Sequence, residues 1–157
     1  MKKGLALLAL FVAVLISACS KETSVEKATQ QNQLNTWSFS VGSTQYSGTI
    51  DTSYVEDFSV FQFINVEGFT PVNNGQIFVS FGGTSLQVGE YVFPFANFGY
   101  AENGELVFET GTTTTDFRIV FTELTADRAV GTFSGTVLES TTGNPIVISN
   151  GRFATTR

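Results

Sequence analysis

Beyond Asn35 the chain alternates between apolar and polar positions with a period of two along almost every segment. This spacing places successive side chains on opposite faces of a β-strand, and the residues that favour strands are abundant here. No apolar set recurs at the spacing of an amphipathic helix. The pattern therefore predicts an all-β domain. The expected strands are Thr36–Val41, Gln45–Ile50, Asp57–Asn65, Gln76–Phe81, Tyr91–Phe93, Asn97–Ala101, Glu105–Thr110, Asp116–Leu124, Ala129–Glu139 and Pro145–Thr155.

Short polar segments between these strands have the chemistry of turns. Asn103-Gly104 lies between two apolar runs, which is a strong hairpin signal because both turn residues must adopt positive φ. Residues 125–128 and 142–145 are further turn candidates. Pro94 cannot donate a ladder hydrogen bond, so it marks a bulge, a loop or a sheet edge. Strands joined by such short turns pair antiparallel.

Two architectures can hold this number of short antiparallel strands. We predict an antiparallel β-sandwich of about nine strands, with a closed up-and-down β-barrel as the alternative. The run FSVFQFI, residues 58–64, is apolar on both strand faces. Such a strand fits a sandwich with a covering loop, and it equally fits a barrel wall that packs outward, so the barrel stays open.

Glycine and tryptophan positions add expectations about packing. Gly131, Phe133 and Gly135 share one face of a predicted strand. The missing side chains leave space for a neighbouring aromatic ring, or for a ligand, to lie against the backbone. We expect packing to use this space, and we expect Trp37 to anchor the core or its edge.

The amino-terminal segment has a different pattern. Met1-Lys2-Lys3 is positively charged, and the next 15 residues, Gly4 to Ala18, carry no charge. A membrane-spanning helix needs about 20 apolar residues, so this run is too short. A charged start, a short apolar run and small residues at its end are typical of a secretory signal peptide.

The apolar run ends in Ile16-Ser17-Ala18-Cys19, which contains the only cysteine of the chain. This sequence resembles the bacterial lipobox. The resemblance implies cleavage before Cys19 and covalent lipid on its sulfur and its amine. Several acyl chains on one residue give stable membrane anchoring. The alternative is an ordinary signal peptide followed by an unpaired cysteine.

These features divide the chain into three parts. Residues 1–18 form the expected lipoprotein signal peptide, residues 19–35 the lipidated cysteine with a polar tether, and residues 36–157 the all-β domain. Ser20-Lys21-Glu22 resembles the export tag of Bacteroidota surface lipoproteins. We expect a lipid-anchored location in the outer membrane, with the periplasmic face and the cell surface both open.

Three further stretches resemble a family of small Bacteroidota lipoproteins of uncharacterised function. They are Gly89-Glu90-Tyr91, Gly131-Thr132-Phe133 and Asn150-Gly151-Arg152-Phe153. The resemblance covers residues 37–156. It implies a β-rich lipoprotein from that phylum, and it brings no catalytic residue with it.

The charge of the predicted domain excludes one class of partner. From Thr36 onward the chain has four arginines, no lysine and twelve acidic residues, so its formal charge is −8. A surface of this charge repels phosphate backbones, so we expect no nucleic-acid partner.

Residue types also exclude several kinds of catalysis. The chain has no histidine, its sole thiol is the expected lipidation site, and the domain has no lysine. Nucleophilic triads, histidine or cysteine metal sites and Schiff-base chemistry are therefore excluded. Carboxylate pairs remain, because a glycosidase needs only two facing acids. The candidates are Asp51, Glu56, Asp57, Glu67, Glu105, Glu109, Asp116 and Glu123.

Two other chemistries stay open. Calcium held by Asp51, Glu56 and Asp57 is an alternative because hard cations take oxygen ligands, although the ligand spacing of an EF-hand is absent. The stretch YVFPFANFGY supplies the candidate binding aromatics Tyr91, Phe95, Phe98 and Tyr100. Exposed rings of this kind can stack on sugars or fill a partner's groove. In the alternative view, Phe93, Phe95 and Phe98 close one end of the core.

These observations together predict an outer-membrane-anchored lipoprotein whose all-β domain binds or assembles and does not catalyse. Besides the membrane, the expected partner is a protein or a glycan, and no cofactor is expected apart from the covalent lipid. One alternative is a carboxylate-dependent, glycan-active enzyme, which requires a cleft holding two acids in opposed environments. Another is a purely structural component of the envelope.

Overall fold

The computed structural model describes residues 34–157, and the expected signal peptide and the expected lipidation at Cys19 lie outside the described residues. None of the described residues belongs to a helix long and apolar enough to cross a membrane. The elements are β1 (Thr36–Val41), β2 (Thr44–Asp57), β3 (Gln62–Thr70), the 3₁₀ turn η1 (Val72–Asn74), β4 (Gly75–Gly83), β5 (Gly89–Val92), β6 (Ala96–Glu102), β7 (Glu105–Glu109), β8 (Arg118–Leu124), β9 (Arg128–Glu139) and β10 (Pro145–Thr156).

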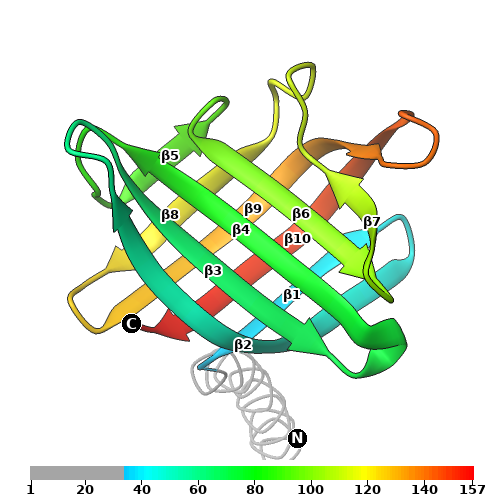
Figure 1. The fold of residues 1–157 in the computed structure, drawn as a ribbon, viewed down its shortest axis with the longest axis horizontal. Helices are drawn as coiled ribbons and strands as arrows, with labels where there is room; N and C mark the ends of the chain where they lie inside the picture. Colours follow the sequence, from blue (N-terminus) through cyan, green and yellow to red (C-terminus); the bar gives the residue numbers. More distant parts are fainter. Residues whose placement is uncertain (1–33) are drawn as a thin grey trace, which may run out of the picture. The chain divides into compact units, whose positions relative to one another are not determined.

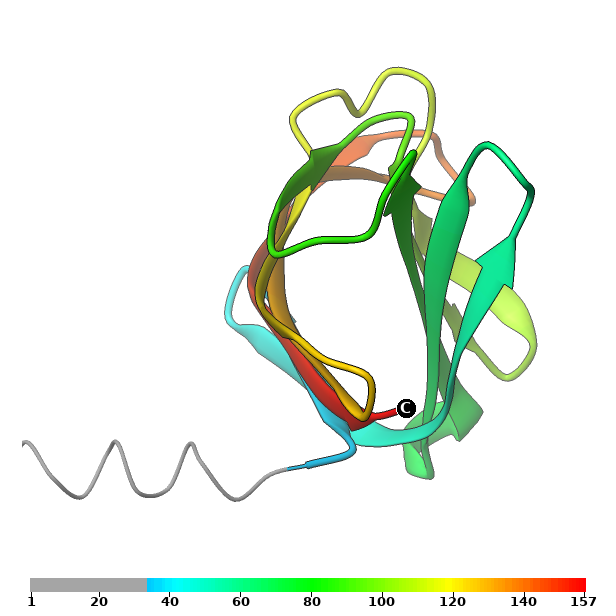
Figure 2. The same ribbon diagram turned by 90° about the vertical axis from the view of Figure 1, so that its left-hand side faces the viewer.

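Eight of the strands form a closed ring. The order β1-β2-β3-β4-β6-β7-β9-β10 is antiparallel throughout, and β10 pairs with β1, so that Thr36 lies opposite Ala154. In Figure 1, strands β2, β3, β4 and β6 cross in front of β1, β9 and β10. Figure 2 shows the two walls curving toward each other. The fold is therefore a closed antiparallel β-barrel.

Strands β5 and β8 stand outside the ring. One edge of β9 pairs with β10 along its length, and β7 and β8 share the other edge. β7 pairs with the end of β9, at Leu138 and Glu139, whereas β8 pairs with its first half, from Ala129 to Ser134. β5 pairs with β8 alone.

The predicted sandwich is wrong, and the closed barrel that was its alternative describes the ring. A sandwich keeps two separate sheets, whereas here the first and last strands pair and leave a single closed wall. Register shifts bend the strands at Ser38/Ser40, Ile50/Thr52, Tyr100/Ala101 and Ile148/Gly151. Bulges of this kind supply the curvature that closure requires.

The boundaries of individual strands were predicted with mixed success. β1 has the expected bounds, and the Asn103-Gly104 hairpin is confirmed, with φ values of 52° and 85°. The expected strand Asp57–Asn65 is wrong, because β2 continues to Asp57 and the chain turns before β3. The Asp57 carboxylate accepts a hydrogen bond from the Ser59 backbone N–H at 2.8 Å, and Ser59 has a φ of 69°.

Aromatic side chains fill the interior of the barrel. The buried rings are those of Trp37, Phe39, Phe81, Tyr91, Phe98, Tyr100, Phe108, Phe117, Phe121, Phe133 and Phe153. An eight-stranded barrel is just wide enough for its own side chains, so this interior is a packed core. The indole N–H of Trp37 donates to the Thr49 carbonyl at 3.0 Å, which confirms Trp37 as a core anchor.

The packing expectation for the glycine-containing face of β9 is confirmed at Gly131. A Cβ atom added at Gly131 would lie 2.6 Å from Cζ of Phe153. The space left by this glycine is therefore occupied by a neighbouring aromatic ring of β10, so packing and not a ligand explains the residue.

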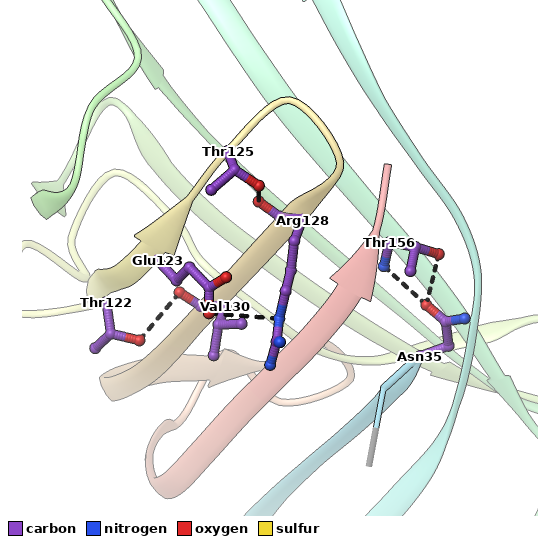
Figure 3. Close-up of polar contacts among 7 residues, drawn as sticks. All are labelled: Asn35, Thr122, Glu123, Thr125, Arg128, Val130 and Thr156. Atoms are coloured by element: carbon purple, nitrogen blue, oxygen red, sulfur yellow. Dashed lines mark hydrogen bonds and ion pairs between the residues drawn. The ribbon is translucent and has the colours of Figure 1, made fainter. Parts of the chain in front are cut away.

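Asn35 fastens the start of the barrel to its last strand. Its side-chain Oδ1 accepts hydrogen bonds from the backbone N–H of Thr156 at 2.9 Å and from the Thr156 hydroxyl at 3.1 Å (Figure 3). Its backbone carbonyl accepts from the Ile50 N–H at 2.8 Å.

On the neighbouring β8–β9 turn, Arg128 Nε lies 3.4 Å from a carboxylate oxygen of Glu123 (Figure 3).

Replacing Asn35 with alanine is expected to lower the free energy of unfolding by about 1–2 kcal/mol. The variant loses the hydrogen bonds that the Asn35 side chain accepts from Thr155 and Thr156, and Asn35 has a φ of 59°, a conformation that asparagine tolerates better than alanine. Urea denaturation measures the loss. The control is Asn97→Ala, which removes only a 3.4 Å hydrogen bond to the Pro94 carbonyl. Equal losses in the two variants would contradict a special role for Asn35.

Candidate functional site

A groove of about 470 Å³ lies on the outer wall of the barrel, across β2, β3, β4, β6 and β7. We call it the wall groove. β3, β4 and β6 face the viewer in Figure 1. The side chains that shape it are those of Asp51, Glu67, Phe69, Gln76, Phe78 and Leu106.

Strand register brings these residues together in two adjacent rows across the wall. Because side chains alternate between the two faces of a strand, residues opposite one another in register share a face. In the first row, Phe78 lies opposite both Glu67 and Gly99. The second row joins Phe69, Gln76, Ala101 and Leu106. The intervening residues Gly68, Ile77 and Tyr100 are buried.

Small residues make the wall hollow at this place. A Cβ atom added at Gly99 would meet no heavy atom closer than Leu106 Cδ1, at 3.8 Å. Phe78 and Leu106 border this space, and they are 39% and 42% exposed. Gly99 and Ala101 therefore leave an open floor between apolar side chains that solvent can reach.

The wall groove is acidic at one end and apolar at the other. Asp51 of β2 and Glu67 of β3 place carboxylates at the first end, and the Tyr54 hydroxyl donates to Glu67 Oε1 at 3.1 Å. Leu106 of β7 lies at the other end. The residues that line the groove include no arginine or lysine. The site can thus accept hydrogen bonds or attract cations at one end and bury apolar groups at the other.

A second hollow, of about 350 Å³, is lined by Tyr46, Thr70, Asn73, Tyr100 and Glu102. The Tyr100 hydroxyl donates to Glu102 Oε1 at 3.1 Å. Burial, together with this carboxylate, raises the pKa of Tyr100 above its usual value. Burial and the charge of Glu102 also raise the pKa of Tyr46. Tyr46 stacks on Phe39 with 4.7 Å between ring centroids, so the floor of this hollow belongs to the core packing.

The four candidate binding aromatics do not form one surface. Tyr91, Phe98 and Tyr100 are buried core residues, as the alternative view expected for Phe98. Phe95 alone lies in a surface cluster, with ring centroids 5.4 Å from Phe61 and 6.4 Å from Phe63. Phe93 is 37% exposed and does not close the core.

The surface cluster joins the β2–β3 turn to the β5–β6 connection. Phe58 is 57% exposed and lies edge-on to Phe63, with 6.1 Å between ring centroids. The backbone N–H of Gly82 donates to the Phe95 carbonyl at 2.9 Å and fixes the connection to β4. None of the rings in this cluster lines the wall groove.

The candidate carboxylates fall into separate places. Asp51 and Glu67 line the wall groove. Glu56 instead accepts a hydrogen bond from Asn65 at 3.2 Å, and Asp57 accepts one from Gln62 at 3.1 Å. These hydrogen bonds, from Gln62 and then from Ser59, lower the pKa of Asp57. Among residues 34–157 no three His, Cys, Asp or Glu side chains gather as a metal site, so Asp51, Glu56 and Asp57 form no ligand set there.

Sequence reasoning missed most of the wall groove. Asp51 and Glu67 were two of eight candidate acids, and Phe78 and Leu106 were expected only as strand residues. Phe69 was expected in the loop between two strands, whereas the structure places it in β3. A signal exists in QIFVSF, residues 76–81, where Phe78 adds an apolar side chain to the otherwise polar face of the strand. Phe78 is 39% exposed in the structure.

The fold and the groove define the class as a closed eight-stranded antiparallel β-barrel with two additional strands outside the ring. No family model, no curated protein sequence and no solved structure matches this chain. Any assignment of function must therefore be argued from the chain's own residues.

Proposed function

We propose that this protein is an outer-membrane-anchored lipoprotein whose barrel is a non-catalytic binding module, with the wall groove as its binding surface. One observation carries the proposal. Rings fill the barrel interior, so recognition falls on the outer wall, where the groove combines exposed apolar side chains with hydrogen-bond acceptors. Ligand sites are typically concave and apolar, hold a few polar groups and have volumes of about 300–1,000 Å³.

The anchor is argued from the amino-terminal sequence. Ile16-Ser17-Ala18-Cys19 ends a short apolar run, and Cys19 is the only cysteine of the chain. A lipidated Cys19 would leave a tether up to residue 35 between the membrane and the first strand. A flexible chain of that length reaches on the order of 20 Å, which leaves the groove accessible to a partner.

A glycan-active enzyme is the second candidate. It is favoured by the position of Asp51 and Glu67 on the same groove, because two carboxylates are enough for glycoside hydrolysis. A hydrolase would cleave an oligosaccharide and would lose this activity in Asp51→Asn or Glu67→Gln. A binding module would release the sugar unchanged.

Replacing Cys19 with alanine is expected to abolish lipid attachment and to release the protein from the membrane fraction. The measurement is incorporation of an alkyne-tagged fatty acid in the producing cells, followed by fractionation. Ser20→Ala is the matched control and should keep both the label and the membrane association. Labelling that persists in the Cys19 variant would overturn the anchor. Protease treatment of intact cells then distinguishes the cell surface from the periplasmic face.

A further inference from the structure

We infer that the wall groove takes an extended, positively charged peptide segment of a partner protein. This inference rests on the proposed binding function and names the chemistry of its ligand. A basic side chain of the segment lies against Asp51 and Glu67, and an apolar side chain lies over Gly99 between Phe78 and Leu106.

The charge of the groove selects a cation. Asp51 and Glu67 are both exposed, and the residues that line the groove include no base to neutralise them. The surrounding domain has twelve acids and four arginines. Arg118 and Arg128 already lie beside Glu90 and Glu123, at 4.0 and 3.4 Å. A field of this sign attracts basic segments and repels acidic ones, and a guanidinium group can form charge-assisted hydrogen bonds with a carboxylate.

The other end of the groove selects an apolar group. Gly99 leaves open space beside Leu106, and Phe78 lies opposite Gly99 in the register. An aromatic ring beside a strand glycine can serve simply to cover the backbone. Here, however, Phe78 remains 39% exposed and Leu106 42% exposed. An aliphatic side chain placed over Gly99 would remove apolar surface of both residues from water.

The strand spacing fixes the distance between the two groups. The basic group lies against Asp51 on β2 and the apolar group lies over Gly99 on β6, three positions apart in the order β2-β3-β4-β6. Neighbouring strands are about 4.8 Å apart and an extended chain advances about 3.3 Å per residue, so the span is about 14 Å, or four residues. The segment should therefore carry its basic and apolar residues four positions apart.

A neutral saccharide is the competing ligand class. Its rings could stack on Phe78, and its hydroxyl groups could donate to Glu67 or Gln76. The affinity of a neutral saccharide is not increased by the formal charge of −8 on the residues from Thr36 onward or by the absence of bases in the groove. The affinity of a basic peptide is increased by both. The two classes also differ in salt dependence, because salt screens exposed charges and has little effect on a neutral ligand.

The test uses the full-length lipidated protein in a neutral detergent and saturation-transfer NMR, which detects weak ligands without labelling the protein. The probe is acetyl-Arg-Ser-Thr-Ser-Leu-amide. A peptide with citrulline in place of arginine removes the charge and keeps the shape, and cellobiose represents neutral sugars. We expect saturation at both the arginine and the leucine protons. We also expect affinity to fall about tenfold with citrulline or on raising the salt to about 0.5 M.

Two groove variants should weaken binding of the probe, one at its arginine end and the other at its leucine end. Asp51→Asn with Glu67→Gln should reduce affinity about tenfold and abolish the preference for arginine over citrulline. Gly99→Val fills the floor and should remove saturation of the leucine protons. The control Glu90→Gln with Asp127→Asn removes the same charge at residues that do not line the groove, and it should keep affinity within about twofold. Thermal melts confirm that each variant is folded.

The remaining outcomes overturn the inference in distinguishable ways. If the citrulline peptide binds with the same affinity as the arginine peptide, the peptide lies elsewhere on the protein. The same conclusion follows if the Gly99→Val variant binds the probe as the wild type does. If cellobiose binds and the probe does not, the ligand class is wrong while a binding module remains. If cellobiose is cleaved, the protein is an enzyme and both proposals are wrong. If no probe binds although Cys19 carries lipid, the basic-peptide inference is wrong and the anchor stands.

Discussion

Replacing Phe39 with alanine is expected to lower the free energy of unfolding by about 3–5 kcal/mol. Phe39 is fully buried, and its ring lies within 6.5 Å, centroid to centroid, of six other aromatic rings. The substitution removes that burial and leaves a cavity at the centre of the barrel. Denaturation followed by the fluorescence of Trp37, the sole tryptophan, measures the change.

Phe78→Ala is the matched control for this prediction. The same atoms are removed, but Phe78 lies on the outer wall and is 39% exposed. Its removal should cost about 1 kcal/mol or less, as expected for a cross-strand contact on a surface. Similar losses at the two positions would show that the interior is not the packed core described above.

Replacing Gly68 with alanine is expected to destabilise the protein by about 1–3 kcal/mol. A Cβ atom there would lie 2.5 Å from Trp37 Cδ1 and 2.5 Å from the Thr49 carbonyl oxygen. Since both distances are too short, β2 must shift away from the added atom, and the indole must also leave its position. The second response would lengthen the hydrogen bond from the indole to Thr49. A lower denaturation midpoint with an altered Trp37 emission maximum would support this account.

Gly99→Ala makes the same chemical change on the neighbouring part of the wall. Its nearest contact would be Leu106 Cδ1 at 3.8 Å, which is an ordinary van der Waals distance. Stability should therefore stay within about 0.5 kcal/mol of the wild-type value, without a change in Trp37 emission. Equal destabilisation at Gly68 and Gly99 would indicate a general intolerance of side chains on this wall.

Local sequence chemistry predicted the turns better than the closure. The Asn103-Gly104 turn is set by two adjacent residues that accept positive φ, so a dipeptide contains the information. The Asp57–Asn65 prediction failed because Phe58, Val60 and Phe61 are apolar but belong to an exposed turn. Closure depends on β10 returning to β1, a contact between opposite ends of the described chain that no local pattern specifies.

The wall groove was beyond prediction for a related reason. Glu67, Phe78, Gly99 and Leu106 lie on four different strands, and the strand register alone brings them together. A slip of one residue in any pairing would exchange the outer and inner faces of that strand. The bulges at Ile50/Thr52 and Tyr100/Ala101 shift the register within this very wall. Their positions cannot be read from periodicity.

The pairing of β1 with β10 also determines when the barrel can form. Contacts between distant parts of a chain are slow to establish, because the entropy of closing the intervening loop is lost before the contact stabilises the fold. Until Thr155 and Thr156 reach Asn35, the edges of β1 and β9 have no β10 between them. A chain that is made from its amino-terminal side therefore cannot close this barrel until β10 is available to pair with both β1 and β9.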